Sequence, residues 1–220
     1  PRMVSKIDKR PEHRGAVAKL LAALLLTARG TVFLYQGQEL GAVNVAFRNI
    51  DELRDIESLN RFRTLREQGV SAKEAWKRVI GGTRDHARTP MQWTNGPYGG
   101  FSACEPWIRL GDKDVCNAET QTDDESSVWS AYRMLIALRK AHPALVYGAF
   151  VPYAPKRADV FCYFRQDDTE CFYVEANLCD RTIRPPKRPK GAKPVFSSFG
   201  TIERALRPYE ANLYRVTGRE

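Results

Sequence analysis

Apolar residues recur at helical spacing near the start of the chain. Within residues 17–25 the apolar side chains fall three and four positions apart, and Gly30 ends the run. This pattern predicts a helix that begins near Pro11 and has a broad buried face. The almost wholly apolar residues 31–35 follow directly and predict a strand buried on both faces of a parallel sheet. A helix followed by a buried strand is typical of α/β proteins.

Further helices are predicted downstream. Asp55 is placed to cap a helix that follows it, and Ser71 with Glu74 forms a capping box that starts another. Apolar spacing over residues 127–141 predicts one more. Residues 83–120 are rich in Pro and Gly and carry aromatic residues among polar ones, which predicts a long irregular loop. Long ordered loops in compact domains are usually functional.

Toward the C-terminus the hydrophobic period changes from about 3.6 residues to about 2. Residues 160–164 and 171–174 are apolar runs on either side of a short polar turn, which predicts a β-hairpin. Further strands are expected around Val195 and Leu213. The change in period predicts an all-β tail that begins near residue 150.

Composition is that of a globular protein, with 43% apolar and 10% aromatic residues in 220. A formal charge of +9 raises nucleic acid or an anionic membrane as a partner. Most basic residues are interleaved with acids, however, and the densest basic run, residues 184–193, is broken by prolines. We therefore expect a solvated loop there, Arg188 included, and no nucleic-acid partner.

Cysteine usage indicates a reduced setting. The five cysteines are an odd number without a CxxC pair, which predicts a cytoplasmic protein. The longest apolar stretch, residues 16–28, is interrupted by Lys19 and is too short to cross a bilayer, and the first residues lack the apolar segment of a secretory signal. No membrane association is predicted. The sequence has no metal-ligand spacing, and we expect no cofactor.

Several segments together resemble one known family. Residues 35–41, YQGQELG, resemble the YQGxEIG segment at the end of the eighth barrel strand in the α-glucosidase branch of the α-amylase superfamily. Residues 84–93, RDHARTPMQW, followed by GGF at 99–101 and EPWI at 105–108, resemble the RDNARTPMQW…AGF…EPW stretch of that branch. Residues 206–211, LRPYEA, are similar to the last strand of its C-terminal β domain. The chain thus resembles glycoside hydrolase family 13 enzymes of the oligo-1,6-glucosidase type.

The resemblance implies an architecture and a reaction. Residues 1–150 would be the C-terminal part of a TIM (β/α)8 barrel, with the long loop after strand eight, and residues 151–220 an antiparallel β-sandwich domain. The complete enzyme would hydrolyse α-1,6 or α-1,4 glucosidic bonds at the non-reducing end of oligosaccharides by a retaining mechanism. That mechanism needs two carboxyl groups roughly 5 Å apart. In the family these carboxyl groups precede the position that corresponds to Pro1. We therefore expect no catalytic residue in this chain, and we expect the chain alone to be inactive.

The resemblance also implies substrate-binding residues. Arg84 would lie at the blind end of the glucose pocket, paired with an upstream Asp and reaching the terminal sugar. Arg88 would support the same wall, and Glu57 would face the next sugar unit. Guanidinium groups suit this task because their forked donors match sugar hydroxyls and carboxylates. The residues alone leave two other readings open, a structural ion-pair network for the arginines and a solvated helix position for Glu57.

Three more loop residues have alternative interpretations. Trp93 and Trp107 either stack against sugars or anchor the loop by being buried. His86 stands where many relatives have Asn, and no serine or cysteine nucleophile is placed beside it. We therefore expect His86 to be a hydrogen-bonding loop residue and not a catalytic base.

Two rival functions remain open. An isomerising transglycosylase, such as a sucrose isomerase or trehalose synthase, shares most of this framework. A non-catalytic amylase-like interaction domain is the second rival. The resemblance also implies that the strand predicted at residues 31–35 lacks at least one of its neighbouring barrel strands within this chain. We therefore expect self-association through this exposed barrel edge.

Overall fold

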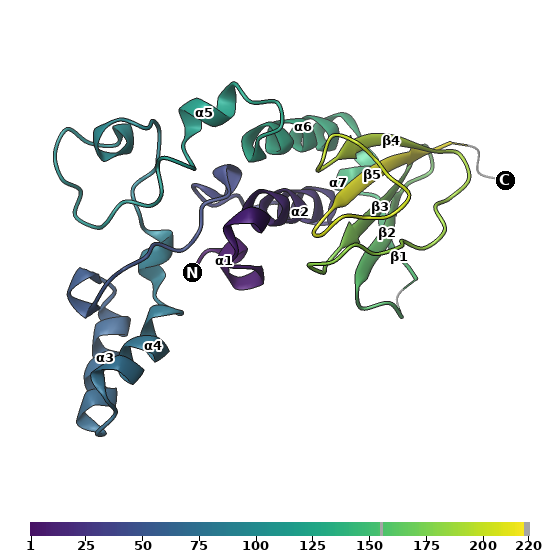
Figure 1. Cartoon of the computed structure of the whole chain (residues 1–220). Coiled ribbons are helices and arrows are strands. Elements are labelled where there is room, and N and C mark those ends of the chain that lie inside the picture. The colour runs from purple at the N-terminus through teal and green to yellow at the C-terminus, as the bar shows by residue number, and fades with distance from the viewer. Residues whose placement is uncertain (155, 218–220) are drawn as a thin grey trace.

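The computed structural model describes residues 1–154 and 156–217 (Figure 1). The helices are α1 (Met3–Ile7), α2 (Arg14–Thr27), α3 (Ile56–Glu67), α4 (Ala72–Ile80), α5 (Ala118–Thr122), α6 (Val128–Ala141) and α7 (Pro143–Val146). Short 3-10 turns are η1 (Pro11–His13), η2 (Gln38–Leu40), η3 (Ile50–Glu52), η4 (Arg84–Ala87) and η5 (Pro97–Gly100). The strands are β1 (Ala149–Tyr153), β2 (Val160–Gln166), β3 (Cys171–Asn177), β4 (Ala192–Ser197) and β5 (Ala211–Val216). The four helices expected from periodicity and caps are confirmed as α2, α3, α4 and α6.

The five strands form one antiparallel sheet in the order β1-β2-β3-β5-β4. The predicted hairpin is confirmed as β2 and β3, and the strands expected around Val195 and Leu213 are β4 and β5. Strand β1 was not predicted; it contains Pro152 and lies at a sheet edge, where a missing N–H donor is tolerated. The expected sandwich would need a second sheet, and all strands in the described ranges belong to this one.

The main core lies between the helices and one face of the sheet. Leu20 and Leu26 of α2 and Leu135 of α6 join a buried cluster with Phe172 of β3 and Leu213 of β5. Figure 1 shows α2 and α6 side by side, with the sheet at one end of the molecule and the α3–α4 pair extending from the other. The α3–α4 pair has its own smaller apolar cluster, formed with the segments before α3 and after α4.

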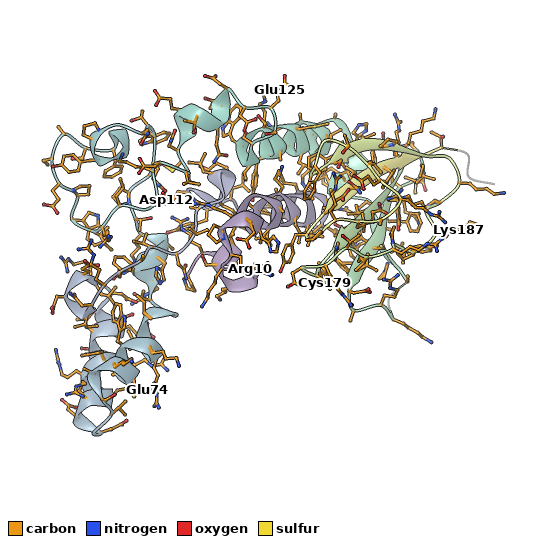
Figure 2. All side chains as sticks on the ribbon, in the orientation of Figure 1. Arg10, Glu74, Asp112, Glu125, Cys179 and Lys187 are labelled. Carbon is orange, nitrogen blue, oxygen red and sulfur yellow. The ribbon has the colours of Figure 1, made fainter. Side chains whose placement is uncertain are left out.

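Two arginines, one buried and one exposed, join the sheet to the helices. Arg165 of β2 is fully buried and donates to the main-chain oxygens of Leu145 at 2.8 Å and Gly148 at 3.0 Å, and also to that of Thr27 at the end of α2. Carbonyls at helix ends lack partners within the helix, so a forked donor is well suited to them. At the opposite end of α2, Arg10 pairs with Asp180 beside Cys179 (Figure 2). The helices and the sheet are thus packed against each other as one body.

The expected strand at residues 31–35 is wrong. This segment has no regular secondary structure and pairs with no strand among the described residues. Its side chains are exposed, with Phe33 at 82%, except for that of Val32, which is partly buried. An apolar run forms a strand only where another backbone completes its hydrogen bonds. The expected self-association through this segment stays a prediction.

The expected solvation of Arg188 is also wrong. Its guanidinium forms an ion pair with Glu175 of β3, with nitrogen-to-oxygen distances of 2.8 and 3.0 Å. The Glu175 side chain is fully buried and also accepts from the Tyr214 hydroxyl at 2.8 Å. A buried carboxylate needs a cation and donors, and the basic run supplies the cation. Among the described residues, no helix has the length and apolar character needed to cross a membrane.

Candidate functional site

Asp55 is the centre of a charged cluster at the base of the α3–α4 pair. Its side chain is almost fully buried and makes no capping bond to α3, contrary to the expected cap. Instead, one carboxylate oxygen accepts from Arg84 Nε at 2.8 Å, and the other accepts from the Ser58 hydroxyl at 2.9 Å. Burial raises the pKa of Asp55, but the hydrogen bonds from Arg84 outweigh it and hold the pKa at about 2. The carboxylate is therefore ionised at neutral pH.

Arg84 has a carboxylate partner within this chain, at Asp55, and the pairing with an upstream Asp that the resemblance implies stays a prediction. Its Nε and Nη2 atoms both face Asp55, and Nη2 lies 3.4 Å from a carboxylate oxygen of Glu57. The Nη1 atom contacts no acceptor in the described part of the chain, and the side chain is 49% exposed. One edge of the guanidinium is thus fixed, and the other is open to a ligand.

Arg88 and Glu57 lie around the same carboxylate. Arg88 Nη1 is 3.7 Å from Asp55 Oδ1 and 3.7 Å from Asp85 Oδ1. Glu57 is on the first turn of α3 with its side chain 78% exposed, so its carboxylate is free to accept from a ligand. The structure therefore brings together all three residues expected from the sequence, Arg84, Arg88 and Glu57, and adds Asp55 between them.

Asp85 holds the segment before α3 in place. Its Oδ2 atom accepts from the main-chain N–H groups of Arg54 at 2.7 Å and Asp55 at 2.9 Å. Its Oδ1 atom is buried without a hydrogen-bond partner, which makes Arg88 its nearest compensating charge. The one acid of the RDHAR segment, Asp85, thus has a structural role, because it fixes the backbone before α3 and lies beside the Arg88 guanidinium.

His86 is a hydrogen-bonding loop residue, as expected. Its Nδ1 atom accepts from the Val45 N–H at 3.1 Å, which places the proton on Nε2, and Nε2 donates to the Ile80 carbonyl at 2.7 Å. Burial lowers the pKa of His86. A neutral ring with both nitrogens engaged has no free site for proton transfer.

Arg2 supports the cluster, although sequence reasoning gave it no role. Its buried guanidinium donates to the main-chain oxygens of His86 at 3.0 Å, Ala87 at 3.3 Å and Gln36. These bonds join the start of the chain, the YQGQELG segment and η4. No local pattern in the sequence indicates such a bond between residues more than eighty positions apart.

The groups around Arg84 differ in whether a ligand could reach them. Both oxygens of Asp55 are occupied by donors, so this carboxylate is not free to attack a substrate. Trp93 and Trp107 are 51% and 56% exposed, so neither is a buried anchor. In the described ranges, no group of three or more His, Cys, Asp or Glu side chains is placed to hold a metal ion.

Comparison with known proteins finds relatives that are longer than this chain. It is 42% identical over 186 residues to trehalose-6-phosphate hydrolase of Escherichia coli strain K12, a match that covers 84% of this chain and 34% of the relative. It is 34% identical over 226 residues to oligo-1,6-glucosidase of Halalkalibacterium halodurans, which covers 97% of this chain and 40% of the relative. The chain therefore spans well under half the length of these relatives.

The chain also matches solved structures and one protein-family model. A trehalulose synthase variant superposes with a TM-score of 0.90 at 35% identity, over 98% of this chain and 41% of that one. An isomaltulose synthase variant from Erwinia rhapontici NX5 superposes with a TM-score of 0.90 at 32% identity, over 99% and 41%. The model of the alpha-amylase catalytic domain matches residues 1–148. Because this match covers more than half of the 220 residues, the chain belongs to the alpha-amylase family.

Proposed function

We propose that this chain is part of a retaining α-glucosidase and contributes one wall of the pocket for the terminal glucose. The observation that carries the proposal is the half-exposed Arg84 guanidinium, which Asp55 fixes along one edge and leaves open along the other. A donor held in this way fits a sugar hydroxyl without losing side-chain freedom on binding. Hydrolysis of α-1,6 or α-1,4 bonds would belong to the longer protein, as in the oligo-1,6-glucosidase relative.

The architecture fits this assignment. Residues 1–150 would be the C-terminal part of a (β/α)8 barrel and residues 151–220 the β domain that follows it, with a facing sheet if that domain is a sandwich. The end of the family match at residue 148 and the start of β1 at Ala149 support this boundary. The exposed segment at residues 31–35 would pair with a preceding barrel strand in the longer protein.

The division of chemistry follows from the carboxylates. A retaining glycosidase needs a nucleophilic carboxylate and an acid/base carboxyl roughly 5 Å apart on either side of the bond. Asp55 is buried by Arg84 and Ser58, which leaves Glu57 as the exposed carboxylate beside Arg84. We assign Glu57 to contact the second sugar unit and Arg88 to hold the wall behind Arg84. The chain alone would therefore bind but not hydrolyse.

An isomerising transglycosylase is the second candidate. The superposition on trehalulose and isomaltulose synthase variants at a TM-score of 0.90 favours it as an alternative. Both enzymes would use the same wall for glucose and differ in the acceptor that attacks the enzyme-bound sugar. The unpaired state of all five cysteines supports a reduced, cytoplasmic setting for either enzyme.

Substitution of Arg84 in the protein that carries this chain with the rest of its catalytic domain tests the proposal. Arg84→Ala should lower kcat/KM for isomaltose or p-nitrophenyl α-glucoside by roughly thirty- to two-hundred-fold, which corresponds to the loss of a charge-assisted bond of about 2–3 kcal/mol. Arg84→Lys should restore little, because an ammonium group lacks the planar fork.

The control is Arg63→Ala, because Arg63 is exposed on the same helix as Glu57 and forms no ion pair within the described ranges. Its activity should equal that of wild type. Equal activity of Arg84→Ala and wild type, with both proteins folded by circular dichroism, would remove Arg84 from the site. Product analysis with sucrose separates the two candidates, since an isomerase yields an isomer of sucrose where a hydrolase yields glucose and fructose.

A further inference from the structure

A pocket lies beside the Arg84 cluster and is not part of it. It has a volume of about 430 Å³ and opens between η3 and the loop that joins η5 to α5. In Figure 1 this loop extends at the upper left, above the α3–α4 pair. The charged and aromatic lining residues of the pocket are Arg48, Glu52, Arg54, Tyr98, Glu105, Trp107 and Arg109. The volume falls within the range of about 300–1,000 Å³ typical of small-molecule sites.

Two aromatic side chains are presented in this pocket and are not buried by it. Trp107 is 56% exposed and Tyr98 is 38% exposed. Tyr98 has a φ of 50°, a left-handed conformation that is uncommon for a residue with a side chain. Strained backbone of this kind persists where the surrounding structure enforces it, and it clusters at binding sites. The loop therefore holds an aromatic ring in the pocket at a conformational cost.

The charged groups are nearly balanced in sign. Arg109 donates to Glu52 at 3.1 Å, and Glu52 also accepts from the Arg48 main-chain N–H at 2.8 Å. The side chains of Arg48 and Glu105 line the pocket without an ion pair in the described part of the chain. Three arginines and two glutamates leave both forked donors and free acceptors at the rim. A phosphate or carboxylate would use the donors alone, whereas a neutral polyhydroxylated ligand uses donors and acceptors together.

We propose that this pocket is an accessory binding site for a glucosyl unit of an α-linked oligosaccharide, with the Trp107 indole as the stacking surface and Arg48 and Glu105 as hydroxyl partners. The apolar face of a sugar ring packs on an aromatic face while its hydroxyls bond to the rim. The inference rests on the proposed function, because the ligand class follows from it. The pocket is connected to the Arg84 cluster through the backbone, since Arg54 lines the pocket and the next residue, Asp55, holds Arg84.

The test measures binding of maltotriose to the 220-residue chain by isothermal titration or ligand-observed NMR. Trp107→Ala should weaken binding roughly tenfold or more, as removal of an aromatic anchor does in binding sites. Trp93→Ala is the matched control, because Trp93 is an equally exposed tryptophan of the same loop that does not line the pocket. It should bind as wild type does. A second variant, Tyr98→Asn, removes the ring while keeping a residue that tolerates the left-handed conformation, and it should also weaken binding.

The Arg84→Ala variant of the same chain separates this inference from the proposed function. If it retains maltotriose binding while Trp107→Ala loses it, the accessory site is supported. If Arg84→Ala loses binding and Trp107→Ala does not, the sugar is held by the Arg84 cluster, and the accessory site is overturned while the proposed function stands. Undetectable maltotriose binding by the wild-type chain, or equal binding of inorganic phosphate at the pocket, also overturns it.

Discussion

Replacement of Arg188 by alanine is expected to destabilise the five-stranded sheet, although the sequence predicts a solvated loop at this residue. The change leaves Glu175 without a cation while its carboxylate stays fully buried in the sheet. Removal of one partner of a buried ion pair typically costs about 3–5 kcal/mol, because an uncompensated charge remains. The Tyr214 hydroxyl and Asn212 amide still donate to Glu175, at 2.8 and 3.3 Å, and the Arg188 side chain is itself 26% exposed. We therefore expect the lower end of that range, about 3 kcal/mol.

The assay is thermal unfolding followed by circular dichroism. For a chain of this length, 1 kcal/mol lowers the melting temperature by about 2–4 °C, so Arg188→Ala should lower it by roughly 6–12 °C. The matched control is Lys187→Ala, one residue away in the same basic run, where the side chain is exposed (Figure 2). It should change stability by less than about 0.5 kcal/mol.

A second substitution distinguishes the buried charge from lost packing. Glu175→Gln in the Arg188→Ala background removes the unpaired charge and keeps an acceptor for Tyr214, so it should recover part of the lost stability. Arg188 also lies over the Tyr214 ring at 5.4 Å, and loss of that contact would not be recovered. Equal melting temperatures for Arg188→Ala and Lys187→Ala would refute the reasoning, as would a double variant less stable than Arg188→Ala alone.

Two further predictions concern the cluster and the exposed segment. The pKa of Asp55 is lowered from its usual value of 3.8 to about 2, so its stabilising contribution is complete above about pH 4 and is lost as the pH falls toward 2. The free energies of unfolding of wild type and Asp55→Asn should therefore differ at pH 5 and converge at pH 2. A constant difference across this range would count against the ion pair. Phe33→Asp should reduce self-association of the chain in light scattering, because Phe33 is 82% exposed in a segment with unpaired backbone; an unchanged apparent mass would place the contact elsewhere.

Elements whose stabilising contacts are local could be predicted from the sequence. Ser71 accepts from the Glu74 N–H at 3.3 Å, as its position in the capping box indicates, and the β2–β3 hairpin follows from alternation around a polar turn. The segment at residues 31–35 could not be predicted in the same way. Its apolar composition favours a strand, but a strand depends on a neighbour that the described chain does not supply.

The charged contacts show the same limit over longer separations. Arg84 could be selected from the RDHARTPMQW segment, but its partner could not, because Asp55 is 29 positions away and stands where a helix cap is also expected. Arg188 lies in the segment before β4 and pairs with Glu175 of β3, and only the buried position of Glu175 creates the need for a cation. Sequence patterns indicate which residues are charged or exposed in the usual case, whereas the pairing of a buried charge depends on the completed fold.

This difference also explains why Asp55 and Glu57 do not form a catalytic pair, although both contact Arg84. A nucleophilic carboxylate must present a free oxygen to the sugar, and an acid/base carboxyl must exchange a proton near neutral pH. Asp55 presents neither function, because donors from Arg84 and Ser58 occupy its oxygens and its pKa is held at about 2. The ion pair with Asp55 instead holds the Arg84 guanidinium in one orientation, which is what the proposed sugar-binding role requires. A group that positions Arg84 this firmly is not available to break a glycosidic bond, and in the proposed function the two carboxyl groups of the reaction belong to the longer protein.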